Sequence, residues 1–143
     1  MGHADLDRPA VAAGLLRAKP VLVDKLVAAC DLDPAQAPRA VLEVLRFLSL
    51  VAEADQSLTP SPRVDDAWHE MILCTREYAD LCAQYFGRFM HHDPGGGDAL
   101  NRARFRETIR RYTLRFGTPD PAWWGAPSPL SATADCGPCQ GPP

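Results

Sequence analysis

Apolar residues recur at spacings of three and four along most of the chain, the period of amphipathic helices, and no segment convincingly predicts a strand. We expect a short helix over residues 8–18 and a second from Pro20 to Cys30, with proline at its first position. Asp33 and Pro34 mark the start of a third helix that extends to about residue 54. Its apolar stripe consists of Val41, Leu42, Leu45, Leu48 and Val51.

The second half of the chain predicts two longer helices. Ser61 and Pro62 are a helix start signal, and Gly87 is a stop, so one helix is expected from Pro62 to Phe86. Asp98 is the predicted cap of the next helix, which ends at Gly117. Each helix has one apolar side that we expect to face the core. For the first helix this side consists of Trp68, Met71, Thr75, Tyr78, Cys82, Tyr85 and Phe86. For the second it consists of Phe105, Ile109, Tyr112 and Phe116.

These elements predict an all-α fold, a small bundle of four to five helices over residues 1–117. Residues 118–143 are rich in Pro, Gly, Ser and Ala, and we expect them to form a flexible tail, extended or disordered. Trp123 and Trp124 are the residues of this tail that we expect to pack back on the bundle.

Chain length, net charge and the lengths of the apolar runs limit which partners and which cellular location we expect. A chain of 143 residues fits one domain, and a net charge of −3 supplies no overall attraction to nucleic acid or to an anionic membrane. No apolar run approaches the roughly 18 residues that a membrane helix needs. The N-terminus carries acidic residues where a secretory signal would be basic and apolar, so a cytoplasmic location is expected.

The predicted helix at Pro62–Phe86 and the loop after it hold the main candidate site. Asp65 and His69 are four residues apart and share one side of the helix, and His91 and His92 follow in the loop. Carboxylate and imidazole together are the usual ligands of a divalent transition metal such as zinc or iron. The alternative is structural: Asp65 favours the positive end of the helix and pairs with His69, while the two loop histidines are solvated or cap the helix end.

The cysteines suggest a second, weaker site. Cys74 and Cys82 lie on or beside the apolar face and are expected to be small buried hydrophobes. Cys136 and Cys139 have the spacing of a thioredoxin motif, but the surrounding Pro and Gly residues do not predict the strand and helix that this motif needs. They form a possible redox or metal-binding tail, with an inert tail as the alternative.

The helix that follows Asp98 is strongly basic. A basic helix face contacts phosphates in some proteins, but the preferred interpretation is intramolecular or oligomeric pairing with the acidic remainder of the chain, or a solvated face. Nucleic acid is therefore not an expected partner. The arginines are Arg102, Arg104, Arg106, Arg110, Arg111 and Arg115.

Residues from about Leu45 to Pro94 resemble the uncharacterised glycine-rich-domain-containing protein-like family. The resemblance implies an all-α domain and attaches no activity to it. The matching positions are Val64, Asp65, Trp68, His69, Ile72, Leu73, Thr75, Tyr78, Cys82, Phe86, Gly87, His91, His92 and Pro94.

Three functional hypotheses follow. The first is a small helical protein that binds a metal or other ligand through Asp65, His69 and the loop histidines. The second is a protein–protein interaction module without metal, which uses the flank of the Pro62–Phe86 helix and the arginine-rich helix. The third is a redox or metal-handling role for Cys136 and Cys139. Whether the protein is an enzyme, and its oligomeric state, stay open.

Overall fold

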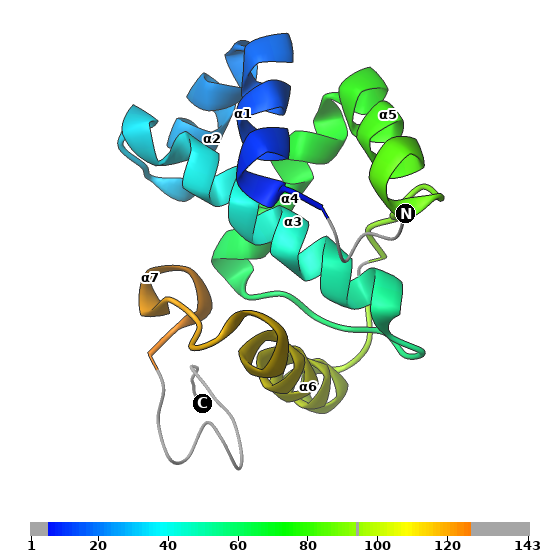
Figure 1. Ribbon diagram of the computed structural model, residues 1–143. Coiled ribbons are helices and arrows are strands. Elements are labelled where there is room, and N and C mark those ends of the chain that lie inside the picture. The colour runs from blue at the N-terminus through cyan, green and yellow to red at the C-terminus, as the bar shows by residue number, and fades with distance from the viewer. Residues whose placement is uncertain (1–5, 94, 127–143) are drawn as a thin grey trace.

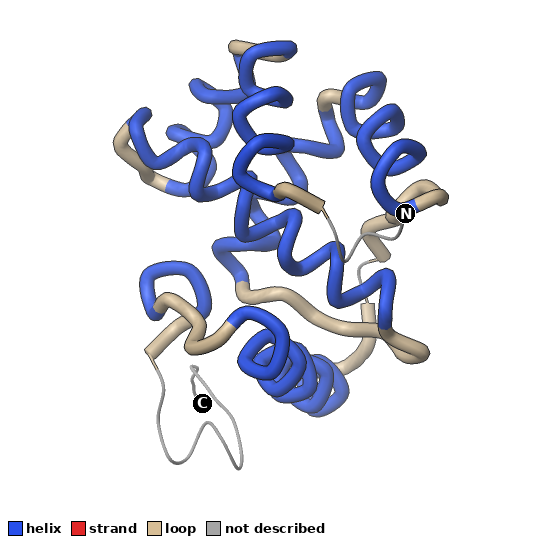
Figure 2. The backbone as a smooth tube through the Cα atoms, in the orientation of Figure 1, coloured by secondary structure: helices blue, strands red, loops and turns tan. Residues whose placement is uncertain are grey.

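Helices make up most of the chain in the computed structural model, which describes residues 6–93 and 95–126 (Figure 1). No strand occurs among these residues, and loops join the helices (Figure 2). The predicted all-α class is therefore confirmed. The elements are α1 (Arg8–Ala18), α2 (Val21–Cys30), a single 3₁₀ turn η2 (Pro34–Gln36), α3 (Ala37–Glu53), α4 (Pro62–Leu73), α5 (Thr75–Phe86), α6 (Asp98–Phe116) and α7 (Pro121–Trp124).

The central element is α3, which packs against α1, α2, α4 and α6. Its entry is set by Asp33, whose side chain accepts a hydrogen bond from the backbone N–H of Ala35, while the side chain of Gln36 accepts one from the Asp33 N–H. Neighbours cover α3 on several sides, so its buried surface is much wider than the predicted stripe. The buried residues are Ala37, Ala40, Val41, Glu43, Val44, Leu45, Phe47, Leu48, Ser49 and Leu50.

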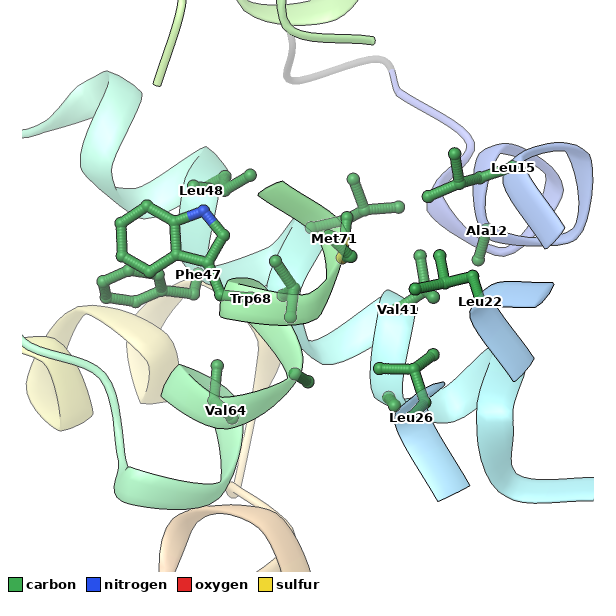
Figure 3. Close-up of a cluster of buried hydrophobic side chains, with 14 of the residues drawn as sticks. Ala12, Leu15, Leu22, Leu26, Val41, Phe47, Leu48, Val64, Trp68 and Met71 are labelled. Carbon is green, nitrogen blue, oxygen red and sulfur yellow. The ribbon is translucent and has the colours of Figure 1, made fainter. Parts of the chain in front are cut away.

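Figure 3 shows the part of the core in which α3 meets its neighbours. Phe47 of α3 packs edge-on against Trp68 of α4, with ring centroids 5.4 Å apart. Val41 of α3 lies on the other side of this view, close to Leu22 and Leu26 of α2. Full burial of one such side chain contributes roughly 1.5–3 kcal/mol, so this apolar cluster is a large part of what stabilises the fold.

The helix expected from Pro62 to Phe86 is interrupted in its middle. Cys74, with φ −83° and ψ 66°, separates α4 from α5 and redirects the chain. Neither Gly nor Pro marks this point in the sequence, so the break has no local signal. The redirected α5 brings Tyr78 back to Trp68 of α4, and this tertiary contact accompanies the break.

A buried carboxylate joins α3 to α6 and α7. Glu43 has no exposed surface and accepts hydrogen bonds from the Tyr112 hydroxyl at 2.6 Å and from Trp124 Nε1 at 2.8 Å. Arg39 and Arg46 bond its other oxygen, at 2.7 and 3.2 Å. Both oxygens of the carboxylate are thus satisfied, as a buried charge requires.

The short helix α7 confirms the expected anchoring of the two tryptophans, since Trp123 and Trp124 are each only 3% exposed. The domain boundary at Gly117 stays a prediction. Of the tail predicted over residues 118–143, the described part contains α7 and is therefore not wholly extended or disordered. The remaining residues 127–143, with Cys136 and Cys139, lie outside the described residues. Among the residues that the structure describes, no helix is both long and apolar enough to cross a bilayer.

Candidate functional site

The first turns of α4 place Asp65 and His69 on the flank of the helix. Ser61 accepts a hydrogen bond from the backbone N–H of Val64 at 3.2 Å, so α4 begins there. Asp65 lies in the first turn, where the helix dipole stabilises a carboxylate, and His69 follows one turn later. Trp68 is 6% exposed and points into the core, whereas His69 is exposed. The predicted core face is confirmed at Trp68 and Met71 of α4, but Thr75, also predicted for that face, is exposed.

A hydrogen-bonded chain fixes the loop of residues 87–93, which we call the histidine loop, against α4. Trp68 Nε1 donates to the Tyr78 hydroxyl at 2.9 Å, and that hydroxyl donates to the carbonyl oxygen of Met90. Tyr78 and Met90 are 1% and 2% exposed. Burial raises the pKa of Tyr78 far above its ordinary value, so the phenol stays protonated and keeps donating. The loop backbone is thus held in one position by buried groups.

The fixed loop brings His92 onto the flank of α4. His92 Nε2 lies 2.6 Å from Asp65 Oδ1, and the His92 ring is tilted over Trp68 with ring centroids 4.6 Å apart. His69 approaches from the next turn of the helix, its ring edge-on to His92 at a centroid distance of 5.9 Å. Three of the four predicted ligand residues therefore lie together.

The fourth predicted ligand residue is directed elsewhere. His91 is exposed, and its ring packs against Phe89, 4.6 Å away between centroids, rather than against α4. Phe89 in turn contacts Tyr78. The two adjacent histidines thus contact different neighbours, and only His92 reaches Asp65.

The three clustered side chains do not form a metal-coordinating arrangement as they stand. Within the described residues, no three His, Cys, Asp or Glu side chains are placed so that they could hold a metal ion. A tetrahedral zinc with bonds near 2.0–2.2 Å would separate its ligand atoms by about 3.4 Å, wider than the 2.6 Å between Asp65 and His92. The arrangement is a carboxylate–imidazole hydrogen bond flanked by a second imidazole.

The adjacent carboxylates of Asp65 and Asp66 favour the binding of a positively charged group at this cluster. Desolvation raises the pKa of Asp66, the adjacent charge of Asp65 raises it further, and His69 lowers it. Two neighbouring carboxylates create a negative potential at the surface, which attracts cations. Asp65 is 43% exposed and His92 20% exposed at the side chain, so both are open to solvent.

The described cysteines are structural. Cys30, Cys74 and Cys82 are buried and free, and burial is the main cause that raises the pKa of each thiol, that of Cys30 to about 11. A thiol with a raised pKa is a poor nucleophile and a poor metal ligand at neutral pH. Cys136 and Cys139 lie outside the described residues, and their role stays a prediction.

Several arginines of α6 pair with carboxylates of the same chain. Arg110 and Arg111 both contact Glu107, at 2.6 and 2.7 Å, and Arg115 contacts Glu53 at 3.1 Å. Glu53 belongs to α3, so the basic helix is matched by an acidic position on its neighbour. For these three side chains, the pairing agrees with the intramolecular interpretation.

Sequence reasoning missed Glu43 as an important residue. No signal in the sequence marks it, since Arg39, Glu43 and Arg46 recur at helical spacing and predict an exposed polar stripe. The structure buries Glu43 completely, so its carboxylate must find partners. Those partners, Tyr112 and Trp124, are 69 and 81 residues away, and no local pattern points to them.

Comparison with known protein families assigns the chain to a family. No curated protein and no solved structure matches the chain significantly. A family model described as UCP032817-like matches residues 16–115. The resemblance to the glycine-rich-domain-containing protein-like family is therefore wrong, because the match that extends over most of the chain is to a different, uncharacterised family. The motif of α4 and the histidine loop lies inside the matched range, and the chain belongs to the UCP032817-like family.

Proposed function

We propose that Asp65, His69 and His92 form an exchangeable binding site for a divalent transition metal ion such as zinc or iron. The observation that carries this proposal is the 2.6 Å contact between His92 Nε2 and Asp65 Oδ1, beside the ring of His69. A carboxylate and an imidazole that share a proton both offer lone pairs when the proton leaves. A cation then replaces the proton between the same two atoms.

Metal binding would require movement of side chains only. The separation between Asp65 Oδ1 and His92 Nε2 has to widen by less than about 1 Å to admit a zinc ion. His69 is exposed on the surface of α4, so a change of rotamer can turn its ring nitrogen toward the same point. The backbone that carries His92 is already held by the Tyr78 hydrogen bond to Met90.

Three protein ligands leave at least one coordination position for water or another ligand. Structural zinc sites are closed by four protein ligands, whereas sites that exchange ligands or do chemistry keep a position open. The core and the histidine loop are held by buried apolar contacts and by the Trp68–Tyr78–Met90 hydrogen bonds, none of which involves the proposed metal ligands. This supports a role in binding or handling a metal rather than in stabilising the bundle.

The test uses the full chain without an affinity tag, with Cys136→Ser and Cys139→Ser to remove the competing thiols. Cobalt(II) is titrated in, and binding is followed by its visible absorption, which reports ligand type and geometry. We expect one site per chain, and an affinity that falls as the pH is lowered because protons compete for Asp65 and His92.

Matched histidine variants decide whether the site is the proposed one. His92→Ala and Asp65→Asn are each expected to weaken metal binding by at least about tenfold. His91→Ala, one residue away but directed toward Phe89, is expected to leave the affinity unchanged. The absence of binding by the parent protein, or equal losses in His91→Ala and His92→Ala, would refute the proposal.

A further inference from the structure

A groove of about 730 Å³ lies between α1 and α5, on residues that the proposed metal site does not use. Figure 1 shows α5 standing apart from α1, attached to the rest of the bundle through α4. Leu15 of α1 and Leu81 of α5 line the groove and are 8% and 6% exposed. The groove therefore has apolar walls and is open to solvent between two helices.

The α1 wall is shaped for close approach by another helix. Ala10, Gly14 and Ala18 line the groove at intervals of four residues, so they form one smooth side of α1. A Cβ atom added at Gly14 would meet only the end of the Arg17 side chain, at 3.8 Å. Glycine inside a helix costs roughly 0.5–1 kcal/mol relative to alanine, and the folded chain itself makes no use of the missing Cβ.

The charges around the groove define the kind of occupant. Asp7, Glu77 and Asp80 line it together with one cation, Arg17, so the lining is acidic. Glu77 and Asp80 are one turn apart on α5 and form an acidic edge beside Leu81. An occupant that fits both features has an apolar stripe flanked by Lys or Arg.

We propose that this groove binds an amphipathic helix of a partner protein whose apolar face is flanked by basic side chains. Such helices bind by placing an apolar stripe into a groove between two helices. The terminal segments of this chain lack the basic side chains that the acidic groove requires, since residues 1–5 and 127–143 contain no Lys or Arg.

A second copy of the chain fits less well than a separate partner. Its basic helix, α6, belongs to a different surface from the α1–α5 groove, so the contact would join two unlike surfaces. Contacts of this kind produce rings when the rotation between copies closes and open chains when it does not. A separate helix needs no such assembly.

The probe for this proposal is a labelled helical peptide of about 15 residues, with a leucine stripe flanked by lysines, and a counterpart in which glutamates replace the lysines. Binding to the full chain is measured by fluorescence anisotropy. We expect the lysine peptide to bind and the glutamate peptide to bind at least about tenfold more weakly, because like charges oppose association.

Three variants localise the binding. In Gly14→Leu the new side chain occupies the groove without a clash inside the folded chain, because only the end of Arg17 lies near the Cβ position. It is expected to weaken binding of the lysine peptide by about tenfold or more. The double variant Glu77→Lys, Asp80→Lys is expected to reverse the preference between the two peptides. Asp55→Lys, at a side chain that is 93% exposed on the α3–α4 connection, is the matched charge control and is expected to have little effect.

Thermal unfolding followed by circular dichroism establishes that each variant is folded. If Gly14→Leu does not fold, the charge-reversal variant still tests the groove. Equal binding of both peptides, or an affinity unaffected by charge reversal at Glu77 and Asp80, would overturn the proposal. So would self-association of the parent chain in sedimentation experiments that Gly14→Leu abolishes, because the occupant would then be a second copy.

Discussion

The replacement Glu43→Ala is expected to destabilise the fold far more than the replacement of a carboxylate at the surface. Glu43 connects α3 to α6 and α7 through the hydroxyl of Tyr112 and the indole N–H of Trp124. Both donors belong to side chains that are almost fully buried, 1% and 3% exposed. Alanine supplies no acceptor, so both donors would lose the partner that replaces water.

The magnitude follows from these lost partners. A buried donor left without an acceptor costs about 1–3 kcal/mol, so the two together cost about 2–6 kcal/mol. Arg39 and Arg46 add less, because their side chains are 39% and 28% exposed and can turn to solvent. We expect a loss of about 3–5 kcal/mol in the free energy of unfolding, a large part of the roughly 5–15 kcal/mol of a typical domain.

Urea unfolding followed by far-ultraviolet circular dichroism measures this loss through linear extrapolation. Glu107→Ala is the matched control, since Glu107 also accepts hydrogen bonds from two arginines but does so at the surface of α6. Its removal is expected to cost less than about 1 kcal/mol. Glu43→Gln should fall between the two, because its amide oxygen still accepts from Tyr112 or Trp124. If Glu43→Ala and Glu107→Ala differ by less than about 1 kcal/mol, the proposed role of the buried carboxylate is refuted.

Three further predictions concern other parts of the bundle. Hydrogen bonding by Arg110 lowers the pKa of Glu107 from 4.5 to about 2, so its stabilising effect is complete above about pH 4.5 and is lost as the pH falls toward 2. In Glu107→Gln the free energy of unfolding should change less between about pH 4.5 and 2, by at most about 1 kcal/mol relative to the parent protein. Urea unfolding across this pH range measures the difference. Tyr78→Phe removes the hydroxyl that donates to the Met90 carbonyl. It should lower the free energy of unfolding by about 1–3 kcal/mol and accelerate amide hydrogen exchange in the histidine loop. Unchanged exchange would contradict the role of Tyr78 in holding the loop. Gly14→Ala should raise the free energy of unfolding by about 0.5–1 kcal/mol, and a decrease would show that α1 needs glycine there.

The candidate site was only partly predictable from sequence. The spacing of Asp65 and His69 correctly placed both on the flank of α4, because helical geometry relates residues four apart. The sequence offered His91 and His92 as equivalent alternatives. The structure distinguishes them, because Tyr78 bonds the Met90 carbonyl and thereby orients the loop so that His92 faces α4.

The incorrect family resemblance rested on a short part of the chain. Apart from Pro94, the matching positions lie in α4, α5 and the histidine loop. Two of them, Trp68 and Tyr78, fasten the loop to the helix. A family match over residues 16–115 includes α2, α3 and almost all of α6 as well, and it is correspondingly more specific.

The sequence by itself determined the helical class, most helix starts and the division of α4 into a buried face and a polar flank. These properties depend on residues a few positions apart, such as Ser61 with the first turn of α4. Only the tertiary structure decided the break at Cys74, the choice of His92 as the partner of Asp65, the burial of Glu43 and the groove between α1 and α5. Each of these depends on atoms brought together from distant parts of the chain, and their free energy is realised only when the helices pack.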